Sequence, residues 1–173
     1  MFANATAIAP DALLGAVLAR VAVATPPNVK LPALIGSGYG SLNCLHALIG
    51  ASGAGKSTTM ETASDLLPLL EEIDIDKEGS IGTGEGIIES YLGEVTVSGE
   101  GERTITEKQQ TKTRILFSVD EGQIMSDMSR RNGSTLMSVL RSAWSGQTLG
   151  QSNASKATSR ELKKHTYRLA VGM

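Results

Sequence analysis

One octapeptide of this chain limits its fold more than any other feature. It matches the pattern G-x-x-x-x-G-K-[ST] without a gap, in the order Gly50, Ala51, Ser52, Gly53, Ala54, Gly55, Lys56 and Ser57. Glycines allow a backbone to aim several N–H groups at one anion, and the start of a helix adds partial positive charge there. The pattern therefore predicts a phosphate-binding loop between a strand and a helix.

The polar residues at the end of the octapeptide suit a nucleoside triphosphate with its metal ion. Lys56 supplies a mobile cation for the β- and γ-phosphates, and the Ser57 hydroxyl can ligate Mg²⁺. Thr58 follows at a position where such loops often contact the α-phosphate. We therefore expect ATP and Mg²⁺ as ligands, held by residues 50–58.

The segments around the octapeptide have the expected character. Residues 42–49 are apolar apart from Asn43 and His46 and are predicted to form a buried strand, with His46 packed there rather than catalytic. Residues 57–67 are predicted to form a helix that Pro68 helps to end. Three more segments show strand or helix patterns: strands over 114–119 and 165–173, and a helix over 134–144 with Ser134 as its N-cap. Alternating strands and helices predict a three-layer α/β fold with a mainly parallel sheet.

Apolar spacing also predicts which helix faces are buried. The N-terminal helix, which we expect to begin near Asp11, has five apolar residues at helical spacing: Leu13, Leu14, Val17, Leu18 and Val21. In the later helix, Leu136, Leu140 and Trp144 form one stripe, and Trp144 is expected to anchor that helix to the sheet.

The remaining stretches allow only predictions of local structure or polarity. Residues 71–77 are acidic and are expected to be solvated, and a short strand is predicted at residues 80–81. Residues 94–98 and 103–107 alternate on either side of a glycine-rich turn, which predicts a polar hairpin. Residues 147–164 are polar and rich in serine.

An apolar strand that ends in two acids offers the second half of a metal and phosphate site. Residues 115–119 lead into Asp120 and Glu121. In phosphate-loop proteins the strand beside the loop carries an aspartate that holds Mg²⁺, and a following glutamate can polarise an attacking water. Asp120 is therefore a predicted metal ligand together with Ser57. Two residues are predicted to be catalytic here: Glu121 as a candidate base, and Lys56 as the cation at the phosphates.

Glu85 is an alternative candidate for the base. It lies between glycines in residues 82–86, where a ligand could approach closely. The dipole of a helix also favours an acid at its start, which gives Glu85 an ordinary structural explanation. Both Glu85 and Glu121 remain candidates.

Composition excludes several other kinds of protein. The chain has 173 residues, a formal net charge of −2 and one cysteine, Cys44. This is one domain's worth of sequence with no internal disulfide and no cysteine-based zinc site, which suits the reducing cytoplasm. The apolar run over residues 12–24 contains Arg20, lacks a preceding basic residue and is shorter than the ~20 residues of a spanning helix. We therefore expect neither a membrane anchor nor a signal peptide.

Residues 38–173 resemble a known family of ATPases. The resemblance rests on the octapeptide, on Asp120 and Glu121, and on further segments: 40–43, 82–86, 130–140, 143–146 with 149–150, and 165–168 with 171–172. With these residues the chain is similar to the ATPase domain of phage and mobile-element replication proteins of the actinobacterial type. Those proteins are related to the DnaB/RepA-like hexameric helicases of the RecA-like superfamily.

The resemblance implies a RecA-type core, ATP hydrolysis, a hexameric homo-oligomeric ring and single-stranded DNA in its channel. In RecA-like ATPases the catalytic glutamate follows the second strand, which is the position of Glu85. In AAA+ proteins it adjoins the metal-binding aspartate, as Glu121 does. The resemblance therefore leaves both candidates for the base open.

The resemblance also implies parts that follow the final strand of this chain. In the family that strand continues into a glutamine that senses the γ-phosphate, and further strands and an arginine finger come after it. We therefore expect residues 38–173 to be an ATPase core truncated at its C-terminus, and residues 1–37 to be an N-terminal helix and connector. Turnover is expected to need the missing part or a neighbouring subunit.

Four cations near the end of the chain are candidates for contact with single-stranded DNA: Lys156, Arg160, Lys163 and Lys164. A loop at this place in a RecA-like ring can face the channel, and positive charge would bind phosphates regardless of base sequence. A solvated surface helix over residues 159–164 explains the same charges equally well.

Three functions remain open from the sequence. The leading one is ATP binding and hydrolysis by the motor domain, or a fragment of it, of a phage or mobile-element replicative helicase or primase-helicase acting on DNA. A small-molecule kinase also pairs a phosphate loop with an acidic strand end, although an arginine-rich lid is not evident. A non-catalytic nucleotide-binding or assembly module is the third.

Overall fold

A computed structural model describes residues 8–33, 38–69, 74–76, 81–98, 104–119, 127, 130, 133–151 and 160–172. Its main elements in chain order are α2 (Pro10–Ala24), β1 (Cys44–His46), α3 (Lys56–Leu66), β2 (Asp74–Asp76), α4 (Gly84–Glu89), β3 (Leu92–Ser98), β4 (Thr104–Gln110), β5 (Arg114–Ser118), α6 (Leu136–Trp144), β6 (Leu149–Gln151), β7 (Arg160–Leu162) and β8 (Arg168–Gly172).

A parallel four-stranded sheet with the order β1-β8-β5-β2 forms the centre of the structure. The registers align Cys44 with Ala170, Ala170 with Leu116, and Leu116 with Ile75. The last strand in the sequence, β8, therefore lies between β1 and β5. The strand that leads to Asp120, β5, is therefore separated from the strand before the loop, β1, by one strand.

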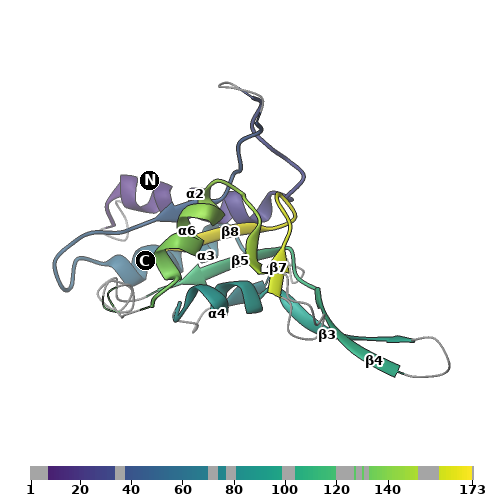
Figure 1. The fold of residues 1–173 in the computed structure, drawn as a ribbon. Helices are drawn as coiled ribbons and strands as arrows, with labels where there is room; N and C mark the ends of the chain where they lie inside the picture. The colour runs from purple at the N-terminus through teal and green to yellow at the C-terminus, as the bar shows by residue number, and fades with distance from the viewer. Residues whose placement is uncertain are drawn as a thin grey trace.

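Helices cover both faces of this sheet, as the ribbon of Figure 1 lets the reader follow. Side chains alternate along a strand, so Ile115 and Phe117 of β5 pack in one core with α4 and α6. Leu116 of β5 and Ala170 of β8 point to the other face and pack against α2. The continuous burial of β8 follows from this coverage of both faces.

Helix α2 buries a different face from the predicted one. Its buried residues are Leu13, Ala16, Ala19, Arg20 and Val23, whereas Leu14, Leu18 and Val21 are 59%, 52% and 45% exposed. Ala19 packs with Ala170 and Leu116 of the sheet. Small side chains allow a helix to pack close to a sheet. The face of α2 that carries Ala16 and Ala19 can therefore approach the sheet more closely than the face that carries Leu14 and Leu18.

Helix α6 also corrects a prediction. Leu136 and Leu140 are buried as expected, but Trp144 is 54% exposed and does not anchor the helix. Trp144 lies about 80° around the helix from Leu136, and the smaller Ala143 faces the core instead. The N-cap is Thr135 rather than Ser134, although the Ser134 hydroxyl accepts a bond of 3.4 Å from the N–H of Leu136.

The polar hairpin predicted from alternation is confirmed and is longer than predicted. Strands β3 and β4 pair antiparallel from Leu92 with Gln110 to Ser98 with Thr104. In Figure 1 this hairpin extends away from the central sheet. Its strands belong to a separate two-stranded sheet.

Two stretches form strands that the sequence did not predict. The segment expected to be solvated, residues 71–77, contains β2, which pairs parallel with β5 at the edge of the sheet. Within the serine-rich stretch, β6 and β7 pair antiparallel. Arg160–Leu162 is therefore a strand and not part of a surface helix, and Leu162 is fully buried beside Leu149. Ile81 is buried but lies outside any strand.

A buried arginine ties the connector after α2 to the sheet. Arg168 begins β8 and is 1% exposed. Its guanidinium donates to the carbonyls of Thr25, Pro26 and Val29 at 3.1, 2.8 and 2.7 Å, and to the Ser41 hydroxyl at 3.3 Å. These bonds hold α2 and the start of β1 to the same edge of the sheet.

Candidate functional site

The phosphate-loop pattern lies in the context that it requires. Strand β1 ends at His46, the octapeptide follows, and α3 begins at Lys56. Gly53 and Gly55 both have φ +78°, a region in which a side chain is strained. The two glycines therefore allow a turn of the loop that alanine at either place would resist.

Lys56 reaches back across this loop. Its Nζ donates to the carbonyl oxygens of Gly50 and Ala51 at 2.9 and 3.0 Å. These carbonyls are weak acceptors compared with phosphate oxygens, to which an ammonium binds in charge-assisted bonds. The ammonium is thus held at the loop in a position from which it can exchange the carbonyls for an anion.

The first turn of α3 completes the loop. Ser57 and Thr58 are exposed there, so both hydroxyls are accessible to a ligand. Thr59 is buried, and its hydroxyl donates to the carbonyl of Gly55 at 2.7 Å. The N–H groups of a first helical turn have no acceptor within the helix, which favours an anion next to them.

The ends of three neighbouring strands gather at the edge of the sheet that carries this loop. His46, Gly172 and Ser118 are in register across β1, β8 and β5. Adjacent strands lie about 4.8 Å apart, which places the end of β5 about 10 Å from the end of β1. Val119 then donates its N–H to the carbonyl of Gly172 at 2.8 Å.

The predicted metal ligand and one candidate base, Asp120 and Glu121, lie outside the described residues. Within the described part of the chain, no group of three or more histidine, cysteine, aspartate or glutamate side chains is placed to hold a metal ion. Ser57 is the one predicted metal ligand that the structure describes, and its exposed hydroxyl suits that role.

A cavity of about 390 Å³ adjoins the loop and extends to the start of α2. Its lining comes from three segments: Ala9, Asp11 and Ala12 of the α2 N-terminus, residues 46–50 at the end of β1, and Ala54, Lys56 and Thr59. The sequence marked none of the α2 residues as part of a site, because Asp11 has the ordinary explanation of an acid in a first helical turn.

His46 packs below the loop, as the sequence predicted. Its ring lies against Gly15 of α2, where an added methyl would be 2.0 Å from Cε1. Its Nε2 is shielded from solvent and makes no hydrogen bond to any described residue. A buried nitrogen without a partner is costly. His46 is also one of the residues that line the cavity.

Glu85 is in the first turn of α4 and is fixed by the start of α6. Its Oε2 accepts a hydrogen bond of 2.9 Å from the hydroxyl of Thr135. Its own backbone N–H, followed by that hydroxyl, lowers the pKa of Glu85, so the side chain is ionised at neutral pH. Glu85 is not among the residues that line the cavity beside the loop.

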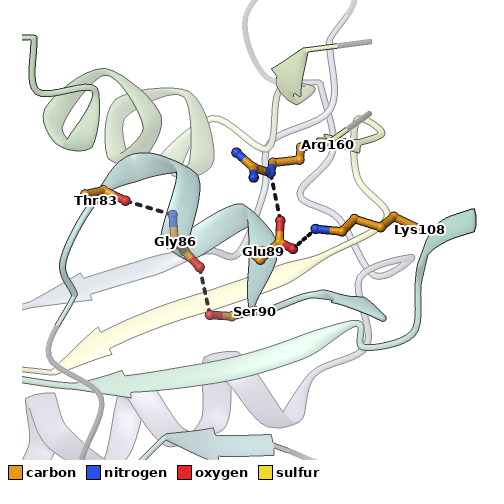
Figure 2. Close-up of polar contacts among 6 residues, drawn as sticks. All are labelled: Thr83, Gly86, Glu89, Ser90, Lys108 and Arg160. Carbon is orange, nitrogen blue, oxygen red and sulfur yellow. Dashed lines mark hydrogen bonds and ion pairs between the residues drawn. The ribbon is translucent and has the colours of Figure 1, made fainter. Parts of the chain in front are cut away.

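The cations proposed for DNA contact differ in their surroundings. Figure 2 shows Arg160 of β7 paired with Glu89 of α4, at 2.9 Å between Nε and Oε2, and Lys108 of β4 paired with the same carboxylate. These pairs lower the pKa of Glu89, with the bond from Lys108 as the largest cause. The Arg160 guanidinium is therefore engaged in an ion pair within the chain.

Lys163 and Lys164 follow β7 and are exposed, so they remain accessible to an anionic partner. Lys156 lies outside the described residues. Of the four predicted cations, the structure thus leaves two that are described and accessible.

Comparisons with protein-family models, curated proteins and solved structures gave no match to this chain. Among the helices that the structure describes, none is long and apolar enough to cross a membrane. The function is therefore argued from the geometry of the site.

Proposed function

We propose that this chain binds ATP with Mg²⁺ at residues 50–58 and hydrolyses it in the cytoplasm, as the motor domain, or a fragment of it, of a phage or mobile-element replicative helicase or primase-helicase. The loop itself carries the proposal. Gly53 and Gly55 adopt the left-handed conformation, and the Lys56 ammonium is held at the carbonyls of Gly50 and Ala51. An ammonium beside a helix N-terminus favours a polyphosphate over a neutral ligand.

The described residues fit both ligands. The loop backbone and Lys56 would hold the phosphates, and the exposed Ser57 hydroxyl would join Asp120 in holding Mg²⁺. The metal, when bound, would neutralise part of the phosphate charge. The ionised carboxylate of Glu85, kept in place by Thr135, is one candidate to polarise the attacking water. Glu121, the alternative base, lies outside the described residues.

The parallel sheet with helices on both faces supports the α/β core that the resemblance implies. A RecA-like core implies a ring of several copies with single-stranded DNA in its channel. Lys163 and Lys164 are the described cations that suit such a contact.

The first experiment measures the affinity for MgATP and the rate of hydrolysis with and without single-stranded DNA. Lys56→Ala should weaken MgATP binding by at least about tenfold, because a charge-assisted contact to phosphate is lost. Lys30→Ala is the matched control, because Lys30 is an exposed cation whose ammonium lies over the Tyr39 ring at 5.5 Å, and it should change neither value. Equal affinities of Lys56→Ala and the parent would reject the proposal.

A second experiment separates the DNA part of the proposal from the nucleotide part. The double variant Lys163→Ala/Lys164→Ala should reduce the slope of log affinity against log salt concentration by about 1.4, since each phosphate contact on a single strand contributes about 0.7. Arg141→Ala removes an exposed cation of α6 and serves as the control. An unchanged slope in the double variant would exclude these lysines from the contact.

A further inference from the structure

The cavity beside the phosphate loop is larger than a phosphate site requires. Its volume of about 390 Å³ lies in the range of pockets that hold small organic molecules. The phosphate loop forms only one side of it. The lining also includes Ala9, Asp11 and Ala12, at the N-cap and first turn of α2.

We propose that this cavity receives the ribose and base of the nucleotide, and that the N-terminal turn of α2 is therefore part of the nucleotide site. This inference rests on the function proposed above. It assigns the nucleoside contact to residues far from the loop in sequence, which no motif marks.

The lining has the mixture of groups that a nucleoside needs. Ala9, Ala12 and Leu48 offer apolar surface for the faces of a base. The carboxylate of Asp11 can accept hydrogen bonds from ribose hydroxyls or from an amino group of the base. Such sites combine a mostly apolar lining with a few polar groups that fix orientation.

His46 is a further polar residue of the lining. Its Nε2 is shielded from solvent, lies against Gly15 of α2 and makes no hydrogen bond to the described residues.

Helices α2 and α3 both direct their N-termini at the cavity, which allows one nucleotide to contact the two helices. Helices α2 and α3 pack side by side, and Arg20 near the end of α2 donates to the carbonyl of Leu67 just after α3 at 2.7 Å. The two helices therefore run in the same direction, and both N-termini border the cavity. The phosphates would lie at α3, where Lys56 is, and the nucleoside would extend toward Asp11.

The test compares two probes, MgATP and magnesium tripolyphosphate, which carry similar phosphate chains but differ in the nucleoside. The parent chain should bind MgATP at least about tenfold more tightly than tripolyphosphate. Ala12→Phe fills the cavity and should abolish this difference, with the affinity for tripolyphosphate unchanged within about twofold. Leu18→Phe is the matched control, because Leu18 lies on the exposed side of the same helix and is 52% exposed.

Each outcome decides the inference. Equal binding of the two probes by the parent, or an Ala12→Phe variant that keeps its preference for MgATP, would overturn it. If neither probe shows binding that depends on Lys56, the proposed phosphate site itself fails. If Ala12→Phe does not fold, Asp11→Ala gives the decision, since loss of the exposed carboxylate in the lining should reduce the preference for MgATP and spare tripolyphosphate.

Discussion

Gly84 of α4 lies directly against Thr135 at the start of α6. A methyl group on Gly84 would be 2.6 Å from the hydroxyl and 2.9 Å from the carbonyl oxygen of Thr135. The same hydroxyl donates to Glu85, the next residue of α4. The absence of a side chain at Gly84 thus allows the close packing that holds a candidate catalytic carboxylate in place.

Gly84→Ala should destabilise the fold. The new methyl would meet backbone as well as side-chain atoms of Thr135, so the two helices must move apart, at a cost of about 1–3 kcal/mol in the free energy of unfolding. Urea unfolding followed by circular dichroism measures the loss.

Gly86→Ala is the matched control in the same helix. A methyl at Gly86 would approach only the Thr83 hydroxyl, at 3.3 Å. Alanine is favoured over glycine inside a helix, which offsets the cost of this one close contact, so the free energy of unfolding should change by less than about 1 kcal/mol. Equal losses in the two variants would show that the α4–α6 contact is not the cause.

Thr135→Val should raise the pKa of Glu85 toward its ordinary value. The Thr135 hydroxyl bonds to the ionised carboxylate and is the second largest cause of the lowered pKa, after the backbone N–H of Glu85. The shift is measured by NMR titration of the Glu85 carboxyl carbon. Thr135→Ser keeps the hydroxyl and should leave the titration as in the parent, whereas a shift in both variants would contradict the role of the hydrogen bond.

His165 should make the fold less stable at mildly acidic pH. Burial, followed by the nearby charges of Lys30, Lys164 and Arg168, lowers the pKa of His165 in the folded chain. The unfolded chain therefore takes up the proton first as pH falls through about 6.5. The free energy of unfolding should decrease from that pH downward and level off below the folded pKa.

His165→Asn tests this dependence and respects the backbone. His165 has φ +58°, and asparagine tolerates that conformation better than most residues. Urea unfolding of both chains between about pH 8 and about pH 5 should show a smaller decrease for the variant. Parallel curves for the two chains would rule out His165 as the titrating group.

Arg168→Met should destabilise the connector between α2 and β1. The variant keeps much of the side-chain volume but leaves the carbonyls of Thr25, Pro26 and Val29 without their donor. We expect a loss of about 3 kcal/mol in the free energy of unfolding. Arg141→Met changes an exposed arginine and should cost little, so similar losses in the two variants would contradict a specific role for the buried guanidinium.

The sequence predicted the elements that depend on residues close together in the chain. The hairpin of β3 and β4 was expected from alternation around a glycine-rich turn, and the structure pairs those strands in register. The loop was expected between a strand and a helix, and it connects β1 to α3. Turn residues and glycine spacing act within a few residues, so the sequence shows them directly.

Contacts between distant residues decided the elements that were missed. Asp74–Asp76 has acidic ends and forms a strand only because β5 offers it an edge. Arg160–Leu162 forms a strand because Leu162 is buried and β6 lies opposite. At Gly150 an added methyl would be 1.8 Å from the carbonyl oxygen of Arg160, a closeness that no local pattern displays.

The sequence by itself determined the glycine-rich loop between β1 and α3, because glycine conformations and a lysine at the start of a helix are local properties of eight residues. Only the tertiary structure decided that β8 lies between β1 and β5, and that α2 buries its alanine face and brings Asp11 to the loop. These outcomes depend on how surfaces far apart in the chain fit together. The free energy of burial is gained only when both surfaces are present.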